Sequence, residues 1–245
     1  MGSILTAIGA YFTGLPSIVQ GMIISFGINK VAEELGMYDQ DINVAGFDRG
    51  IKTNNTKNTH PIPVIYGERI VGGSEYRSIE GTNNKFLHRV MCLGEGEIDS
   101  VKKVFLNNKD ISTISEYIGL VTTEVKTGQV GQSFMGNLVS QVPAWDTTMV
   151  GNQIAYIHVR LEYDRDVFSG IPRLTCLVKG KKVYDPRESS HSQTNTLTWE
   201  WSDNPVLCIL DYLTNTVYGR GIPYDQIDLE TFKNEADYCD ASFNY

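Results

Sequence analysis

The feature that most constrains this fold is a strict two-residue alternation across residues 155–163. Apolar and aromatic side chains stand at every second position, and they are Ala155, Ile157, Val159, Leu161 and Tyr163. Between them lie Tyr156, His158, Arg160 and Glu162. Successive side chains of a β-strand point to opposite faces of its sheet. The alternation therefore predicts that residues 155–163 form a strand of a β-sheet, with one face in a hydrophobic core.

Hairpin signals surround this strand. HPIPVIYGERIVGG, residues 60–73, predicts two strands joined by a turn at Gly67 and Glu68. KFLHRVMCLGEGEIDSVKKVFLNNKDI, residues 85–111, predicts two more strands around residues 94–96 and a turn at Asn107 and Asn108. Residues 112–151 are less regular and are interpreted as an insertion between strands. Hairpins in series predict an antiparallel barrel or sandwich.

The C-terminal third changes from strand to helix patterns. IPRLTCLVKGKKVYDPR, residues 171–187, predicts two short strands in a hairpin with Gly180 at positive φ. A helix is expected to begin at Pro205 after an N-cap at Asp203 or Asn204. Its expected buried face is Val206, Ile209, Leu210, Leu213 and Val217, and Gly219 is expected to end it. A second helix is expected after Asp228, with an inner face of Leu229, Phe232, Ala236 and Cys239.

The N-terminus carries no charged residue before Lys30. Pro16 and several glycines interrupt the apolar run, so a membrane span is not predicted, and no basic segment indicates a signal peptide. We expect an apolar helix over residues 17–35. Its apolar face is the candidate assembly surface, formed by Ile18, Met22, Ile23 and Phe26. Packing on its own domain and packing on symmetry mates or another protein are equally compatible with this pattern.

These patterns predict a mainly β fold with helical segments (α+β), built on one or more antiparallel β-barrel domains. The expected parts are an apolar helical segment at 1–40, a polar linker at 41–59, a β-rich domain at 60–198 with an insertion near 112–151, and a helical segment at 199–245. The chain is interpreted as the N-terminal part of a larger protein.

Charge and cysteine spacing exclude some classes of function. The net charge is -8 with a pI near 5.0, which argues against a nucleic-acid-binding surface. The closest approach to a basic cluster is Lys179, Lys181 and Lys182, which we interpret as solvated charges at a hairpin tip. The cysteines, Cys92, Cys176, Cys208 and Cys239, contain no C-x-x-C pair, so no zinc site is predicted.

No catalytic constellation is predicted. The carboxylates that could serve a glycosidase are Glu95, Glu97 and Asp99, together with Asp164 and Asp166, and they stand in turn-like segments where solvated charges are the expected reading. The histidines, His60, His88, His158 and His191, lack metal-ligand spacing. Ser133 and Ser169 lie outside any G-x-S-x-G elbow. We therefore expect no enzyme activity, no cofactor and no metal.

Several separated segments together resemble a known family. They are residues 180–187 (GKKVYDPR), residues 204–215 (NPVLCILDYLTN), Tyr218 with Gly219, and Cys239 with Asp240. In this order and spacing they resemble the long-tailed phage tail-tip proteins typified by the lambda host-specificity protein J. The resemblance extends from about residue 60 to residue 240 and weakens before it.

The resemblance implies a structural role in a virion. Members of that family form a homotrimeric hub of β-barrel domains that closes the tail tube at its tip. The implied partners are tail-tube and distal tail proteins, the tape-measure protein and, indirectly, a host receptor, while DNA passes the lumen without specific binding. The implied location is the tail tip of a virion assembled in the host cytoplasm. A carbohydrate-binding or glycan-degrading β-domain protein is the alternative.

Overall fold

The computed structural model describes residues 61–241, which form antiparallel strands and three α-helices. The predicted class, mainly β with helical segments and a helical C-terminal part, is confirmed. The chain divides into two compact units between Lys182 and Val183. We call residues 61–182 the β-unit and residues 183–241 the C-terminal unit; the sequence-based domain boundary at 198 remains a prediction.

The first sheet of the β-unit contains the strand with the alternating pattern. Its strands are β2 (Glu75–Glu80), β3 (Phe86–Glu95), β7 (Ile154–Glu162) and β6 (Val121–Thr127), in that order and all antiparallel. The predicted inner residues Ala155, Ile157, Val159 and Leu161 are buried, at most 4% exposed. Tyr163 follows the end of β7 and is 62% exposed. The buried face of this strand therefore ends at Leu161, one member before the predicted end.

The second sheet runs in the order β1 (Glu68–Val71), β8 (Leu174–Val183), β4 (Ile98–Leu106) and β5 (Lys109–Asp110). The hairpin predicted around Gly180 is wrong, because β8 continues through it as one strand. Gly180 allows a close backbone approach instead. The carbonyl oxygen of Ile65 accepts a hydrogen bond from the amide of Lys181 at 2.7 Å, and a Cβ on Gly180 would collide with that carbonyl.

Strands β3 and β4 follow one another in sequence but belong to different sheets, so the hairpin expected there is also wrong. A register shift between Cys92 and Gly94 interrupts β3, and Gly96 turns the chain with φ 79°. Such bulges bend a strand and let it leave its sheet. The turn predicted at Asn107 and Asn108 is confirmed: both have positive φ, as a two-residue hairpin turn requires, and they join β4 to β5.

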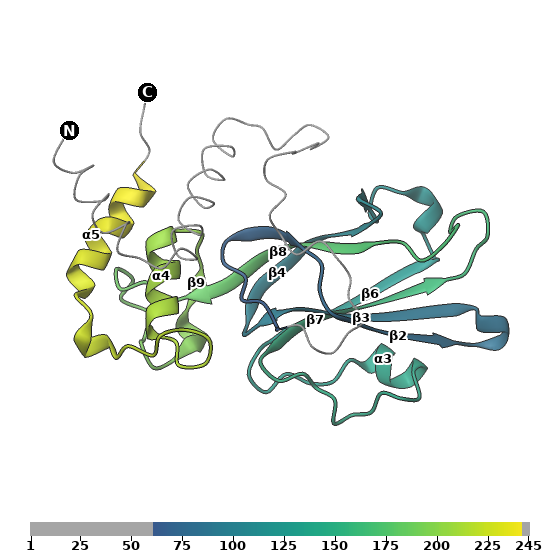
Figure 1. The fold of residues 1–245 in the computed structure, drawn as a ribbon, viewed down its shortest axis with the longest axis horizontal. Coiled ribbons are helices and arrows are strands. Elements are labelled where there is room, and N and C mark those ends of the chain that lie inside the picture. Colours follow the sequence, from purple (N-terminus) through teal and green to yellow (C-terminus); the bar gives the residue numbers. More distant parts are fainter. Residues whose placement is uncertain (1–60, 242–245) are drawn as a thin grey trace. The chain divides into compact units, whose positions relative to one another are not determined.

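Both sheets bury their apolar faces in one core. This core includes Met91 and Leu93 of β3, Ile98, Val104 and Leu106 of β4, Ile157 and Val159 of β7, and Leu174, Cys176 and Val178 of β8. Figure 1 shows the two sets of strands as curved neighbouring layers. The strand predicted before Gly67 is irregular backbone, although Ile65 and Tyr66 are buried.

A second, smaller core lies on the outer face of the first sheet. Residues 128–151, which we call the α3 layer, contain the short helix α3 (Gly136–Gln141). Its Met135, Leu138 and Val142 are fully buried against Val90 of β3 and Tyr156 of β7. Figure 1 shows α3 beside β7 and β2. The segment 112–151, interpreted as an insertion, therefore contains the edge strand β6 as well as this layer.

The C-terminal unit contains β9 (Glu200–Trp201), α4 (Pro205–Thr214) and α5 (Leu229–Asp240). The predicted start of α4 is confirmed, since the side chain of Asn204 caps it and Pro205 is its first residue. Its end and its face are not as predicted. The helix stops at Thr214, before Gly219, and its buried residues are Leu207, Cys208, Leu210 and Asp211. Val217 lies beyond the helix and is 78% exposed.

Helix α5 follows its sequence prediction. Asp228 caps it by accepting hydrogen bonds from the amides of Glu230 and Thr231. Ala236 is fully buried, and the other members of the predicted face, Leu229, Phe232 and Cys239, are half-buried. Helices α4 and α5 contact each other within the unit.

Candidate functional site: a polar network in the C-terminal unit

Arg187 is the centre of a cluster of carboxylates. Its Nη2 donates to Asp185 Oδ2 at 2.7 Å, and its Nη1 lies 2.9 Å from Asp237 Oδ1 and from Asp240 Oδ2 at the end of α5. Hydrogen bonds to Asp185, then to Asp237 and Asp240, raise the pKa of Arg187 above its usual value. The planar guanidinium matches such paired acceptors better than an ammonium would. Arg187 thus ties the turn after β8 to the last turn of α5.

Asn204 joins the two helices. Its Oδ1 accepts from the amide of Val206 at 3.0 Å, which caps α4, and its Nδ2 donates to the carbonyl oxygen of Ala236 in α5 at 2.9 Å. The residue is only 1% exposed. One amide side chain therefore satisfies a helix start and bridges to the neighbouring helix, which explains an asparagine before Pro205.

Asp211 fixes the loop that follows α4. Its Oδ2 accepts a 2.6 Å hydrogen bond from the hydroxyl of Tyr218, and Asp211 is 2% exposed. Gly219 comes so close to the carbonyl of Tyr212 that a Cβ there would collide with it. The amide of Arg220 donates to that same carbonyl at 2.9 Å. Glycine is required here by close approach, and the loop folds back on the helix end.

We call Asp185, Arg187, Asn204, Asp211, Tyr218, Asp237 and Asp240 the motif network. All of them except Asp237 lie in the segments that carry the family resemblance. Around it, Tyr184 contacts the rings of Tyr224, Trp199 and His191. His191 Nδ1 accepts from the amide of Asp185 at 3.1 Å. The hydrogen bonds and ion pairs of the motif network join the turn after β8, α4, the loop after α4 and α5 within the C-terminal unit.

A buried ion pair in the β-unit was not predicted. Glu75 and Arg89 have fully buried side chains, joined by Arg89 Nε to Glu75 Oε2 at 2.9 Å and by a second bond from Nη2. Arg89 Nη1 also donates to the carbonyl of Pro172, and Arg77 pairs with Glu75. Burial lowers the pKa of Arg89, and the nearby Glu75 carboxylate opposes that shift. The available signal was an arginine in phase with Leu87, Met91 and Leu93.

Three of the candidate carboxylates, Glu97, Asp99 and Asp164, have hydrogen-bond partners in the structure. Glu97 receives Lys182 Nζ at 2.8 Å, and Asp99 accepts from the hydroxyl of Ser100. Asp164 caps its own turn by accepting from the amide of Asp166 at 2.8 Å. Lys182 is therefore part of a cross-strand pair on β8 and does not lie at a hairpin tip, which corrects the sequence interpretation.

Among the remaining candidates, Ser133 and the histidines of the sheet have partners in the structure. Ser133 receives a hydrogen bond from Lys126, and His88 contacts His158. Burial raises the pKa of Cys176 to about 12 and that of Cys92 to about 11, which keeps both as protonated thiols. Within residues 61–241, no group of three or more His, Cys, Asp or Glu side chains is placed to hold a metal ion.

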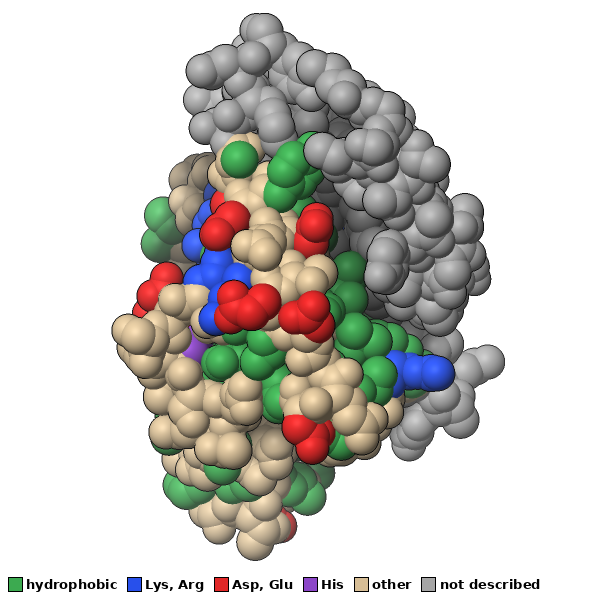
Figure 2. All heavy atoms as spheres, turned by 90° about the vertical axis from the view of Figure 1, so that its left-hand side faces the viewer, with side chains coloured by type: hydrophobic (Ala, Val, Ile, Leu, Met, Phe, Trp, Pro, Cys, Tyr) green, Lys and Arg blue, Asp and Glu red, His purple; other side chains and the backbone are tan. Residues whose placement is uncertain are grey.

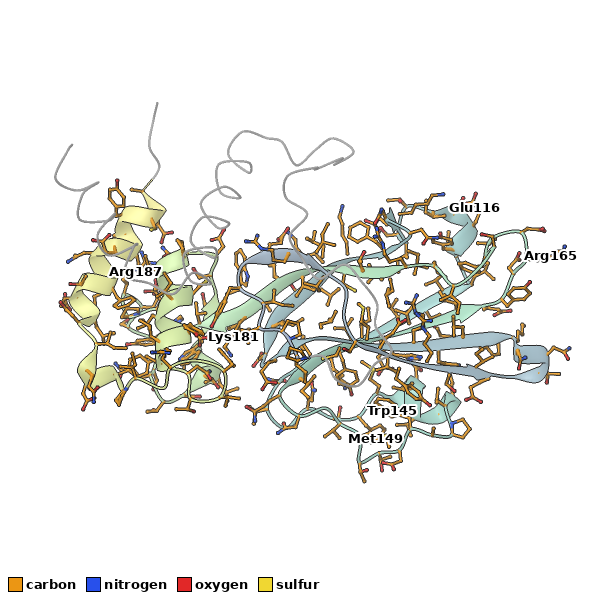
Figure 3. All side chains as sticks on the ribbon, viewed as in Figure 1. Glu116, Trp145, Met149, Arg165, Lys181 and Arg187 are labelled. Atoms are coloured by element: carbon orange, nitrogen blue, oxygen red, sulfur yellow. The ribbon has the colours of Figure 1, made fainter. Side chains whose placement is uncertain are left out.

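Two further expectations concern surfaces. The candidate assembly contacts Ile18, Met22, Ile23 and Phe26, and also His60, lie outside the described residues. In the part of the chain that the structure describes, no helix combines the length and apolar character needed to cross a membrane. On the face shown in Figure 2, acidic and basic side chains lie side by side, and Figure 3 marks Arg187 in the C-terminal unit.

Comparisons with known proteins find distant structural similarity. Searches find no matching protein family and no matching curated protein. Among solved structures, a chain from the virion of a native gene transfer agent particle is 19% identical, with a TM-score of 0.45. The alignment covers 91% of this chain and 47% of that chain. This chain therefore spans less than half the length of that structural neighbour.

Proposed function

We propose that this chain is a structural component of a long-tailed phage tail tip. In this proposal it forms a trimeric hub that closes the tail tube, links it to receptor-binding parts and opens for DNA passage. It has no enzyme activity, and its neighbours are tube and distal tail proteins and the tape-measure protein. The apolar face of residues 17–35 contributes to the trimer contacts.

The observation that carries the proposal is the motif network. The segments that resemble the tail-tip family are separated in sequence, yet Arg187 pairs with Asp240 at 2.9 Å and the hydroxyl of Tyr218 donates to Asp211 at 2.6 Å. A resemblance that arose by chance would have no reason to place its matched residues in mutual contact. These contacts give the matched residues a shared structural role within the C-terminal unit, as expected of a structural component.

Quantitative mass spectrometry and electron microscopy of intact tails test this function. We expect three copies of the chain for each tail, and an antibody against the β-unit should label the end of the tail distal to the capsid. Tails from cells that lack the chain should not be completed. Six or more copies distributed along the tube, or complete tails without the chain, would contradict the proposal.

The alternative of glycan turnover has its own test. Replacing Glu95, Glu97, Asp164 and Asp166 together by the corresponding amides should leave infectivity nearly unchanged, because these groups have structural or solvent contacts. Infectivity and polysaccharide cleavage are measured on the same purified particles. A selective loss of cleavage from particles that still assemble would favour the enzyme.

A further inference from the structure

Two histidines form a buried pair on the outer face of the first sheet. His88 of β3 and His158 of β7 are 1% and 2% exposed, and their rings are nearly parallel with centroids 5.2 Å apart. His88 Nδ1 lies 3.0 Å from His158 Nε2. A hydrogen bond between two imidazoles needs one nitrogen that accepts, so at least one ring must be neutral. Two protonated rings would place N–H against N–H and charge against charge.

The α3 layer lies next to this pair. Val90 and Tyr156 stand two positions from His88 and His158 on the same face of their strands, and both are buried under the apolar residues of the layer. The ring centroids of Trp145 in the layer and Tyr76 on β2 are 5.9 Å apart. Figure 3 labels Trp145 and Met149 in this layer. The histidine pair and the contact of the layer with the sheet thus share one surface.

The layer supplies almost no countercharge. Its only charged residue is Asp146, whose carboxylate accepts from the amide and hydroxyl of Thr148 at 2.7 and 2.5 Å. An imidazolium beside the α3 layer would therefore face apolar side chains. Burying an unpaired charge is costly. The closed layer therefore disfavours protonation of the two histidines, and their protonation disfavours the closed layer.

The charged groups of the sheet do not remove this conflict. Arg160 of β7 disfavours protonation of both rings, while Glu80 of β2 favours it at His88 and accepts from Ser78 at 2.5 Å. Glu162 pairs with Lys85 at 2.6 Å and with Arg160 at 3.6 Å. From β6, Lys126 donates to Ser133.

Glu124 of β6 connects the pair to the layer. It is the cross-strand partner of His158 in the register of β6 and β7, so both side chains point to the same face. Its two oxygens now accept from the amides of Gly136 and Asn137 at 3.2 Å each, at the start of α3. A positive charge on His158 would compete for this carboxylate and weaken the attachment of α3.

We propose that His88 and His158 form an acid-sensitive latch, in which protonation of the pair releases the α3 layer from the outer face of the sheet. Release exposes Val90, Tyr156 and the apolar side of the layer, and the core between the two sheets stays closed. The latch is a property of the β-unit itself and does not depend on the proposed tail-tip role.

The direction of the pH dependence follows from linkage. Burial, then His88 and Arg160, lower the pKa of His158 to about 4, and burial also lowers the pKa of His88. In an open layer both rings return toward about 6.5. Between these values the closed form binds fewer protons, so closure weakens as the pH falls from about 6.5 toward 4. Each histidine changes the opening equilibrium by at most about tenfold per pH unit.

Hydrogen exchange of the full chain between pH 7 and pH 4.5, corrected for intrinsic exchange, tests the latch. We expect residues 130–145 to lose at least tenfold in protection reversibly, while β3, β7 and β8 keep theirs. His158→Gln and His88→Gln keep a polar side chain without titrating, and each should flatten the transition. His191→Gln in the C-terminal unit is the matched control and should behave as the wild type.

Three results would overturn the latch: a layer whose protection does not depend on pH, the same loss in His158→Gln, or simultaneous loss in the core strands. Should the glutamine variants fail to fold, ring signals of the two histidines in the wild-type protein decide the matter by nuclear magnetic resonance. Titration of both rings must coincide with opening of the layer. Titration without opening would refute the proposal.

Discussion

The β-unit and the C-terminal unit differ in the kind of contact that stabilises each of them internally. The β-unit buries an apolar core between its sheets and, with it, the ion pair of Glu75 and Arg89. In the C-terminal unit, buried apolar residues are fewer, and the turn, α4 and α5 are joined through Arg187, Asn204 and Asp211. Apolar packing accepts many side chains of similar volume, whereas each hydrogen bond needs a particular partner at a particular distance.

This difference explains which unit has the more specific sequence pattern. An apolar alternation predicts a strand in any protein. The pattern of the β-unit therefore indicates its fold class and does not identify a family. The motif network needs an arginine opposite carboxylates and an asparagine between helices. It therefore requires particular residue types at particular positions of the sequence. Substitutions in the two units should consequently differ in how much stability they remove, in which residues lose protection and in which second substitution recovers the stability.

The largest effect is expected for Leu207→Asp in α4. Leu207 is fully buried, and the new carboxylate would lack a positively charged partner among Cys208, Leu210 and Asp211, the other buried residues of the helix. We expect a loss of more than about 4 kcal/mol, enough to unfold the C-terminal unit. Hydrogen exchange should rise throughout residues 183–241. Normal protection there would show that α4 is not central to this unit.

Arg89→Met should have a similarly large effect in the β-unit. The substitution leaves the buried carboxylate of Glu75 without its main partner, which costs about 3–5 kcal/mol in comparable cases. Urea unfolding, followed by the fluorescence of Trp145, measures it. The double variant with Glu75→Gln should recover part of the loss, because the orphaned charge is gone. A double variant no more stable than Arg89→Met would mean that the pair is not coupled.

Arg187→Lys tests the specificity of the motif network. Lysine keeps the charge but cannot present a planar fork to Asp185 while also reaching Asp237 and Asp240. We expect a loss of about 1–2 kcal/mol in the C-terminal unit, because these bonds are charge-assisted but partly exposed. Lys233→Ala removes the exposed pair with Glu230 and should cause no measurable change. Equal effects from both variants would refute a special role for Arg187.

Asn204→Ser separates the two tasks of this side chain. Serine is as good an N-cap as asparagine, but it lacks the amide that donates to the carbonyl of Ala236. We expect Asn204→Ser to cost about 1 kcal/mol for the lost bridge, and Asn204→Ala to cost about 1 kcal/mol more for the lost cap. Thermal unfolding of both variants gives the difference. Identical stabilities would mean that the bridge carries the whole effect.

Local patterns predicted what local physics decides. The strand β7, the turn at Asn107, the caps at Asn204 and Asp228 and the inner face of α5 all depend on neighbouring residues, and the structure has them as expected. The division of β3 and β4 between two sheets depends on contacts distant in sequence, and so did not follow from the pattern. The same is true of the unbroken strand through Gly180 and of the pair between Glu75 and Arg89, which join segments that the sequence keeps apart.

The smallest effect is expected for Val217→Lys, which addresses an error in the sequence prediction. Periodicity extended the apolar face of α4 to Val217, but the backbone leaves the helix after Thr214 and the amide of Val217 donates to Asn215 Oδ1 at 2.8 Å. The side chain is 78% exposed, so a lysine there should change stability by no more than about 0.5 kcal/mol. Leu207→Lys, at an inner position of the same helix, should unfold the unit. A large loss from Val217→Lys would mean that the helix continues past Thr214 and that the apolar stripe read from the sequence is the true buried face.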